Sequence, residues 1–366
     1  MNRTEVAIIG GGIIGLSLAL ELAEAGRQVT VFERSRAMSE ASWAAAGMLA
    51  AGDPENPTGL HALADFSRAL YPQFLDRVTR LSGLAVPIRT TQTIQGATHV
   101  PHGLFELDAF SLNTLVPGIE AGDLKFFLLE EESLSPRDLA RALPAAVRAG
   151  GVTLLEECLV LEARESGGSM LISTGQVSAP QGEWIADAVV YATGAWTEGL
   201  IGIPAAPRKG QMVEIQLPGS HQLNVVLRTP EIYLVPRGDG RIVIGATVED
   251  TGFDKQVDRA AIAGLIESAA ALWPPVRGAS MVESWAGLRP GSPDELPVIG
   301  RLESCPANGM SGGPSSRAWV ASGHFRNGIL LAPGTARLLR QMMLGETPSV
   351  DPSPFRCDRF AFSSVH

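Results

Sequence analysis

The pattern of apolar and polar positions is most regular at the start of the chain. Residues 6–10 form a short apolar run, residues 12–25 show helical spacing of apolar positions, and residues 28–33 alternate like a strand. Gly26 follows the helical stretch, as glycine commonly does at a helix end. The pattern therefore predicts a strand, a helix and a second strand that form one βαβ unit of about 30 residues.

Helical and strand-like stretches also follow one another in the rest of the chain. The Asp239-Gly240 pair between two apolar runs predicts a β-hairpin. Ser135 is expected to cap a helix that begins at Pro136 and ends at Gly150. Further helices are expected over 60–81, 260–272 and 334–344. Strands are expected at 152–155, 159–163, 170–173, 185–192, 232–236, 241–245, 281–288 and 319–322, with antiparallel β-structure over 211–248 and a loop at 305–316.

Composition narrows the class of protein. The chain has 366 residues, 45% of them hydrophobic and 19% charged, so a sizeable core is expected and a disordered chain is excluded. The net charge is −10 and no basic run is present, which argues against a nucleic-acid partner. Cys158, Cys305 and Cys357 form neither a disulfide framework nor a CxxC metal site, a usage typical of a reducing, cytoplasmic setting. No metal site is expected.

The apolar stretch 6–20 has an alternative explanation as a signal peptide. Three consecutive glycines within it and Glu5 just before it are poor signal features. The stretch is also shorter than the roughly 20 residues of a transmembrane helix. We therefore expect a cytoplasmic protein without a membrane span.

The turn between the first strand and helix carries the clearest chemical motif. Gly10, Gly12 and Gly15 satisfy GxGxxG, and Glu33 ends the next strand. Glycines let backbone N–H groups at a helix N-terminus approach a pyrophosphate, and an acidic residue at this distance accepts the ribose hydroxyls. Arg34 suggests a ribose phosphate or, more simply, a solvated side chain. The unit predicts an ADP-containing cofactor and leaves FAD and NAD open.

Later segments favour FAD. Residues 189–196 and 319–334 are strands that end in Gly-rich turns, and they resemble the later cofactor contacts of FAD oxidoreductases. The chain as a whole resembles the D-amino-acid-oxidase-like FAD-dependent oxidoreductase family, in particular its glycine oxidase type. The stretches that carry the resemblance are AAAGML (44–49), PRKGQM (207–212), IYLVPRGDGRIVIGAT (232–247), WAGLRPGSPDELPVIGR (285–301) and GHFRNGILLAP (323–333).

The resemblance implies an α/β (α+β two-domain) fold. A Rossmann-like FAD-binding domain would be discontinuous, with residues 1–83, 134–206 and 281–344. A β-rich antiparallel substrate domain would comprise residues 84–133 and 207–280, and residues 345–366 would form a C-terminal tail.

The implied reaction is oxidation of a small amine or D-amino acid by hydride transfer to flavin N5. O2 would be reduced to H2O2, and the imine would be hydrolysed or passed on, so that hydrolysis after oxidation of glycine would give glyoxylate and ammonia. The resemblance alone implies a supply to thiamine thiazole synthesis. Two alternatives stay open: a dehydrogenase that passes electrons to a quinone, and a flavin-binding module without turnover. Glycine, sarcosine and D-alanine remain candidate substrates, and homo-oligomers are common in the family.

The same resemblance assigns the substrate site. Arg289, expected just after the strand 281–288, would pair with the substrate carboxylate, because a guanidinium offers two parallel donors. Tyr233 would bind the same carboxylate, or would be a core aromatic residue. Arg326 would be a second arginine near the substrate, or a structural loop residue. Met48 would line the flavin side, and no side-chain acid or base is required. Glu231 and Val248 would tune substrate size and polarity.

The FAD would be bound non-covalently, because the family's attachment cysteine near GLRP has no counterpart here. His324 is expected to position the turn. Val160 matches an adenine contact, though strand valines are ordinarily core residues. The expected cofactor-binding residues are Gly10, Gly12, Ile13, Ile14, Gly15, Glu33, Arg34, Ala41, Ser42, Ala46, Gly47, Met48, Val160, Ala192, Thr193, Gly194, Trp196, His324, Phe325, Arg326, Asn327, Gly328, Ile329 and Leu330.

Overall fold

The computed structural model describes residues 2–175, 182–219, 221–302 and 315–360. The helices are α1 (Ile13–Glu24), α2 (Ala41–Ala44), α3 (His61–Ser82), α4 (Ala109–Leu115), α5 (Pro136–Ala149), α6 (Thr197–Ile201), α7 (Arg259–Leu272) and α8 (Gly328–Leu344). The strands are β1 (Asn2–Ile9), β2 (Val29–Phe32), β3 (Ile88–Thr90), β4 (Thr93–Ala97), β5 (Lys125–Leu129), β6 (Ser133–Leu134), β7 (Thr153–Leu155), β8 (Leu159–Ser166), β9 (Ser169–Gly175), β10 (Gly182–Tyr191), β11 (Ala206–Gln216), β12 (Val226–Arg228), β13 (Tyr233–Gly238), β14 (Arg241–Gly245), β15 (Ser280–Gly291), β16 (Val298–Arg301) and β17 (Ala318–Ser322).

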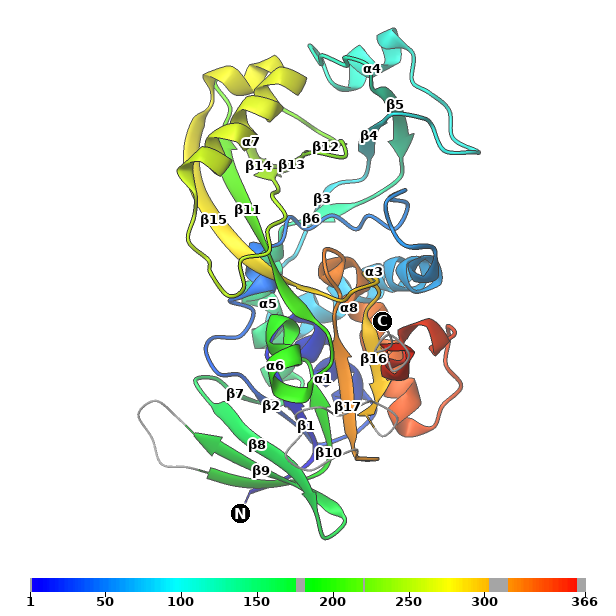
Figure 1. The fold of residues 1–366 in the computed structure, drawn as a ribbon, viewed down its shortest axis with the longest axis vertical. Coiled ribbons are helices and arrows are strands. Elements are labelled where there is room, and N and C mark those ends of the chain that lie inside the picture. Colours follow the sequence, from blue (N-terminus) through cyan, green and yellow to red (C-terminus); the bar gives the residue numbers. More distant parts are fainter. Residues whose placement is uncertain (1, 176–181, 220, 303–314, 361–366) are drawn as a thin grey trace, which may run out of the picture.

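The first sheet has the order β16-β17-β10-β1-β2-β7 (Figure 1). β9 also pairs with β10, and β8 pairs with β9. β1, β2, β7, β10 and β17 run parallel, as the βαβ unit requires, whereas β16 and β9 pair antiparallel. One face buries Val6, Ile8 and Val190 against α1, α3, α5 and α8. The opposite face buries Ala7 and Val189 in a separate core. This explains why the central strands are continuously apolar.

The second sheet has the order β15-β11-β14-β13-β12-β4-β5 and is antiparallel except for the β12–β4 pair. Its core packs Val213, Leu234 and Ile244 against Leu265 of α7. β11 and β15 are long, and Figure 1 shows both running from this sheet into the half of the molecule that holds the first sheet. The mixed α/β architecture expected from the sequence is confirmed.

Local signals in the sequence are confirmed where they are strong. Asp239 and Gly240 take positive φ angles of 54° and 73° in the turn between β13 and β14, as a tight hairpin requires. The Ser135 side chain accepts a hydrogen bond from the Asp138 backbone N–H and caps α5. α3 and α7 also match the expected helices within two residues.

The end of β15 and the start of α8, both beside the site, were predicted wrongly. Arg289 lies within β15 instead of after it, because β11 pairs along the whole length of β15 and places Arg208 opposite Arg289. α8 begins at Gly328 instead of residue 334, although Pro333 lies inside it. Proline cannot donate to the Ile329 carbonyl one turn earlier. The Tyr71 hydroxyl of α3 donates to that carbonyl instead, so the helix continues through the proline.

Several elements gave no sequence signal. β4, β5 and α4 lie in residues 84–133, for which no element was predicted. Positions 305–314 of the expected 305–316 loop lie outside the described residues. Cys158 is a free thiol, but Cys357 is disulfide-bonded, which differs from the expectation that the cysteines form no disulfide. The cytoplasmic setting stays a prediction. Within the described ranges, no helix is both long and apolar enough to span a bilayer.

Candidate active site

A cavity of about 790 Å³ lies where the strand ends of the first sheet meet β11–β15 of the second. Arg289, Tyr233, Arg326 and Met48 all line it, as do Glu231 and Val248. Of the expected cofactor-binding residues, Gly15 and Leu330 do not line it, and the others do. Residues that lie far apart in the sequence, including Glu33, Val160 and Asn327, therefore share one wall of one cavity.

The glycine-rich turn fits a dinucleotide. Gly10 has φ 112°, and a Cβ atom there would lie 2.3 Å from the Ala192 carbonyl oxygen. A Cβ on Gly15 would lie 2.1 Å from the Gly10 carbonyl oxygen. These two glycines therefore let β1, β10 and α1 approach each other, which explains why Gly15 matters without lining the cavity. Gly12 caps α1 without a side-chain hydrogen bond of its own. The Ile13 N–H donates to the Ser42 hydroxyl at 2.9 Å, which leaves the following N–H groups of the first turn for a phosphate.

Glu33 is held in place at the end of β2. One carboxylate oxygen accepts from the Gly11 N–H at 2.7 Å, and the other accepts from the N–H and hydroxyl of Ser35. A fixed, buried carboxylate beside the glycine-rich turn suits the hydroxyls of a ribose. Arg34 is not simply solvated: its guanidinium lies 3.6 Å from the centroid of the Trp196 ring and pairs with Glu40.

A second helix N-terminus meets the cavity. β17 leads through Gly323, with φ 74°, into the turn before α8. Asn327 precedes α8 and makes no side-chain cap on the helix, and its amide Nδ2 donates to Oδ1 of Asn56 at 3.0 Å. Gly328 and Ile329 in the first turn of α8 line the cavity. The positive end of a helix dipole is therefore directed at a bound ligand.

His324 lies at the base of this turn and is buried. Its Nε2 atom is 3.1 Å from the Thr335 hydroxyl. Burial lowers the pKa of His324 to about 3 from its ordinary 6.5. The imidazole is therefore neutral near pH 7, which supports the expected role in positioning the turn over a role as a charged acid.

This burial gives a prediction about stability. Between pH 6.5 and about 3 the unfolded chain binds a proton at this histidine and the folded protein does not, so stability falls as the pH falls through that window. We expect His324→Gln to flatten the pH dependence of the free energy of unfolding by up to about 1.4 kcal/mol per pH unit. Denaturant unfolding between pH 6.5 and 4.5 tests this, with the exposed His61→Gln as control. An unchanged slope in His324→Gln would contradict it.

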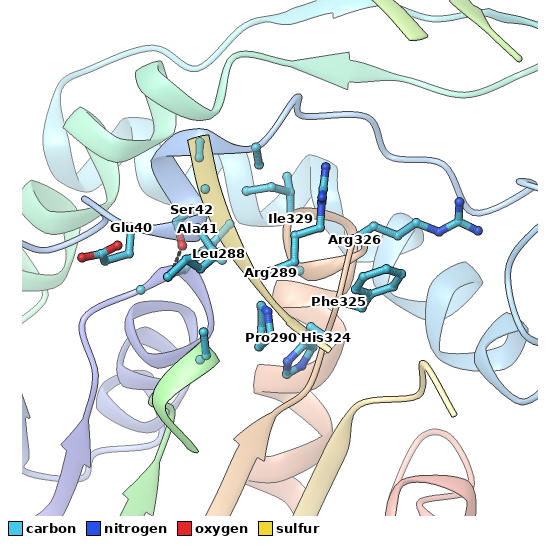
Figure 2. A pocket seen from close by; sticks show the side chains of 18 of the residues that line it. Glu40, Ala41, Ser42, Leu288, Arg289, Pro290, His324, Phe325, Arg326 and Ile329 are labelled. Atoms are coloured by element: carbon cyan, nitrogen blue, oxygen red, sulfur yellow. Dashed lines mark hydrogen bonds between the residues drawn. The ribbon is translucent and has the colours of Figure 1, made fainter. Parts of the chain in front are cut away.

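Arg289 on β15 and Tyr233 on β13 form the polar centre of the site. The Arg289 guanidinium donates to the Thr247 carbonyl oxygen at 3.0 Å, and Arg289 and Tyr233 line the same cavity. Burial raises the pKa of Tyr233, with Arg289 acting in the opposite direction, so the hydroxyl keeps its proton. Both groups can thus donate to an anion. Figure 2 shows Arg289 rising from its strand among Ile329, Arg326 and Pro290.

Two glycines make room for these side chains. A Cβ on Gly210 of β11 would lie 2.0 Å from Nη1 of Arg289. A Cβ on Gly245 of β14, directly opposite Tyr233, would lie 2.4 Å from the Tyr233 hydroxyl. The positions of both donors therefore depend on glycines in the neighbouring strands, where a side chain would collide with them. The sequence alone did not show this relationship.

Arg326 is oriented differently. Its guanidinium pairs with Glu55 at 2.6 Å and lies 3.9 Å from Asp53, and Figure 2 shows its side chain extending away from Arg289. Both arginines line the same cavity. Their guanidinium groups have different partners, the Thr247 carbonyl for Arg289 and the Glu55 and Asp53 carboxylates for Arg326. A direct substrate contact of Arg326 stays a prediction.

Sequence reasoning missed a buried charge cluster beside this site. Arg228 on β12 lies 3.7 Å from Asp53 and 3.1 Å from Glu131, and all three side chains are more than nine-tenths buried. Burial raises the pKa of the Glu131 carboxyl, and Arg228 opposes that shift. None of the three residues lies in a recognisable sequence motif, so no sequence signal pointed to the cluster. Pairing of β12 with β13 places Arg228 opposite Tyr233 and so brings the cluster beside the site. Among the described residues no cluster suited to a metal ion occurs.

The family model described as FAD dependent oxidoreductase matches residues 5–342. Glycine oxidase of Pseudomonas aeruginosa is 34% identical over 96% of this chain and 97% of its own. The bifunctional protein ThiO/ThiG of Trichormus variabilis is 35% identical over 97% of this chain and 55% of its own. The crystal structure of glycine oxidase from Geobacillus kaustophilus matches with a TM-score of 0.88 and 30% identity, covering 98% of this chain and 99% of that one.

The family match explains the arrangement of the cavity. It accounts for the glycine-rich turn, for the carboxylate of Glu33 and for the second helix N-terminus at α8. It also identifies the cofactor as FAD, which the βαβ unit alone did not distinguish from NAD. The chain therefore belongs to the FAD dependent oxidoreductase family.

Proposed function

We propose that the protein catalyses the FAD-dependent oxidative deamination of glycine or another small amine. The observation that carries this proposal is that Arg289 and Tyr233 line the same cavity as the glycine-rich turn at Gly10 and Gly12. This shared cavity supports a role for the two residues as a carboxylate-binding pair near a bound flavin nucleotide. Relatives named glycine oxidase, similar over nearly their whole length, support glycine as the substrate.

The substrate carboxylate would accept hydrogen bonds from the Arg289 guanidinium and the Tyr233 hydroxyl. Arg289 is held by the Thr247 carbonyl, so its orientation is set before the substrate binds. Arg326 and Met48 would complete the substrate site, with Glu231 and Val248 at its edge. When bound, FAD supplies a hydride acceptor at N5 and passes electrons to O2, so glycine yields glyoxylate, ammonia and H2O2 after hydrolysis of the imine. The Tyr233 hydroxyl already carries its proton, and burial lowers the pKa of His324 to about 3, so neither side chain is suited to accept a proton from the amine.

The cofactor would be held by the cavity-lining residues expected from the sequence, with Gly15 acting through packing. The first sheet with α1, α3, α5 and α8 is the core of the FAD-binding domain that we propose for residues 1–83, 134–206 and 281–344. The second sheet supports a substrate domain of residues 84–133 and 207–280. Its edge strand β15 (Ser280–Gly291) comes from the segment proposed for the FAD-binding domain, so the two proposed domains share this sheet. A cytoplasmic location, a homo-oligomeric state and a role in thiamine thiazole synthesis are further parts of the proposal.

The visible spectrum tests the proposal. Flavin bands of the purified protein should bleach when glycine is added without oxygen, and should return with formation of H2O2 when air enters. If only another amine bleaches the flavin, the proposed substrate is wrong and the proposed type of reaction still holds. Recovery with a quinone but not with air would indicate a dehydrogenase. Bands that no small amine or amino acid bleaches would reject catalysis and favour a flavin-binding module.

Non-covalent attachment is a separate prediction. Cys158 is the one cysteine among the described residues that line the cavity, and burial raises the pKa of its thiol, which keeps it protonated and a poor nucleophile. Arg289-Pro290-Gly291 contains no cysteine. Acid precipitation should therefore release the flavin into the supernatant. Yellow colour and flavin absorbance that stay with the denatured pellet would contradict the prediction.

A further inference from the structure

The connection between β14 and α7 contains a segment, residues 249–258, that we call the strap. Both of its ends are fixed to β11. Glu249 and Lys209 exchange two backbone hydrogen bonds of 2.9 Å, and the Asp258 N–H donates to the Gln211 side chain at 2.7 Å. The buried ammonium of Lys209 also pairs with Asp254 at 3.3 Å. The strap therefore has a defined position on the second sheet.

The middle of the strap contacts the half of the molecule that carries the glycine-rich turn. The Phe253 ring stacks on the Trp196 ring with centroids 5.5 Å apart and an angle of 25° between the planes. The Lys255 ammonium lies 3.0 Å from a carboxylate oxygen of Glu40. Trp196 follows β10 of the first sheet, and Glu40 immediately precedes α2. The strap thus bridges elements that belong to the two sheets.

These contacts lie at the cavity. Phe253, Trp196 and Glu40 all line it, together with Arg34, which lies over Trp196 and pairs with Glu40. Arg34 directly follows Glu33, the carboxylate beside the glycine-rich turn. The strap therefore lies beside the end of the cavity that is suited to the nucleotide half of the cofactor. Arg289, by contrast, stands among Ile329, Pro290 and Arg326 (Figure 2).

We propose that the strap is part of the cofactor site: Phe253 and Lys255 hold it against Trp196 and Glu40 and so slow the release of FAD. The inference rests on FAD being bound in this cavity, as the family and the proposed function require. Because the strap is fixed to β11, which also carries Gly210 beneath Arg289, retention of the cofactor depends on the sheet that carries the substrate residues. An aromatic pair contributes enough for loss of Phe253 to accelerate release about 3- to 10-fold.

The test uses the holoenzyme and measures FAD release directly. Each variant is diluted, and the rise of free-flavin fluorescence gives the dissociation rate. Phe253→Ala should release FAD about 3- to 10-fold faster, and Lys255→Ala by a smaller factor, because exposed ion pairs are weak. Phe253→Trp retains a stacking ring and should stay near the wild-type rate. The matched controls are Phe110→Ala, which removes an exposed ring on α4, and Lys125→Ala, which removes an ion pair with Glu106.

The results separate this inference from the proposed function. Wild-type release rates in both Phe253→Ala and Lys255→Ala would overturn the strap proposal, even if glycine still bleaches the flavin. Faster release in Phe253→Ala but not in Phe253→Trp or the controls would support it, even if glycine fails to bleach the flavin. Equal acceleration in Phe110→Ala would show a general loss of stability and would also overturn it.

Discussion

Replacing Arg289 by alanine is expected to lower kcat/KM for glycine by at least about 30-fold, while FAD stays bound. A partly buried, hydrogen-bonded charge pair that loses one partner costs roughly 2–5 kcal/mol, and 1.4 kcal/mol corresponds to a factor of ten. The substrate carboxylate would keep only the Tyr233 hydroxyl as a donor. Steady-state oxygen consumption and the flavin absorbance of the purified variant provide the two measurements.

Two further variants test whether the geometry of the Arg289 guanidinium matters in addition to its positive charge. Arg289→Lys keeps a positive charge but loses the planar pair of donors, so its activity should lie between wild type and alanine. Gly210→Ala keeps Arg289 but adds a Cβ 2.0 Å from its Nη1 atom, which displaces the guanidinium. It should raise KM more than it lowers kcat. Near-normal kinetics in Arg289→Ala would show that the carboxylate binds elsewhere.

A side chain at Gly12 is expected to weaken FAD binding by at least about tenfold, because it occupies space at the N-terminus of α1 where a phosphate would approach the free N–H groups. Gly12 has φ −75° and ψ 179°, which any residue adopts. The only neighbour within 4 Å of its added Cβ is the Ser42 hydroxyl, at 3.3 Å. Gly12→Val should therefore fold and still lose affinity, as titration of the flavin-free protein with FAD will measure.

Comparison with other glycines distinguishes cofactor binding from folding. Gly264→Ala on α7 adds a methyl group into open space and should bind FAD like wild type. Gly10→Ala forces a strained φ angle and a contact of 2.3 Å with the Ala192 carbonyl, so it should lower stability as well as FAD affinity. Wild-type affinity in Gly12→Val would place the pyrophosphate away from the N-terminus of α1.

Local chemistry explains which parts of the sequence analysis succeeded. The turn with Gly10, Gly12 and Gly15 could be predicted because the strand and the helix that it connects lie only a few residues away. The structure contains this unit. The Asp239-Gly240 turn and the Ser135 cap are equally local. The start of α8 was predicted wrongly because the partner that replaces the lost hydrogen bond of Pro333 is Tyr71, in a different helix.

The βαβ unit, the hairpin and the residue types of an FAD oxidoreductase follow from the sequence, because backbone preferences and turn chemistry act over a few residues. That Gly210 and Gly245 make room for Arg289 and Tyr233 is visible in the folded protein alone. The same holds for the position of Arg228 between Asp53 and Glu131, and for the stacking of Phe253 on Trp196. These contacts depend on strand register and on the packing of distant segments, which no local pattern of residues encodes.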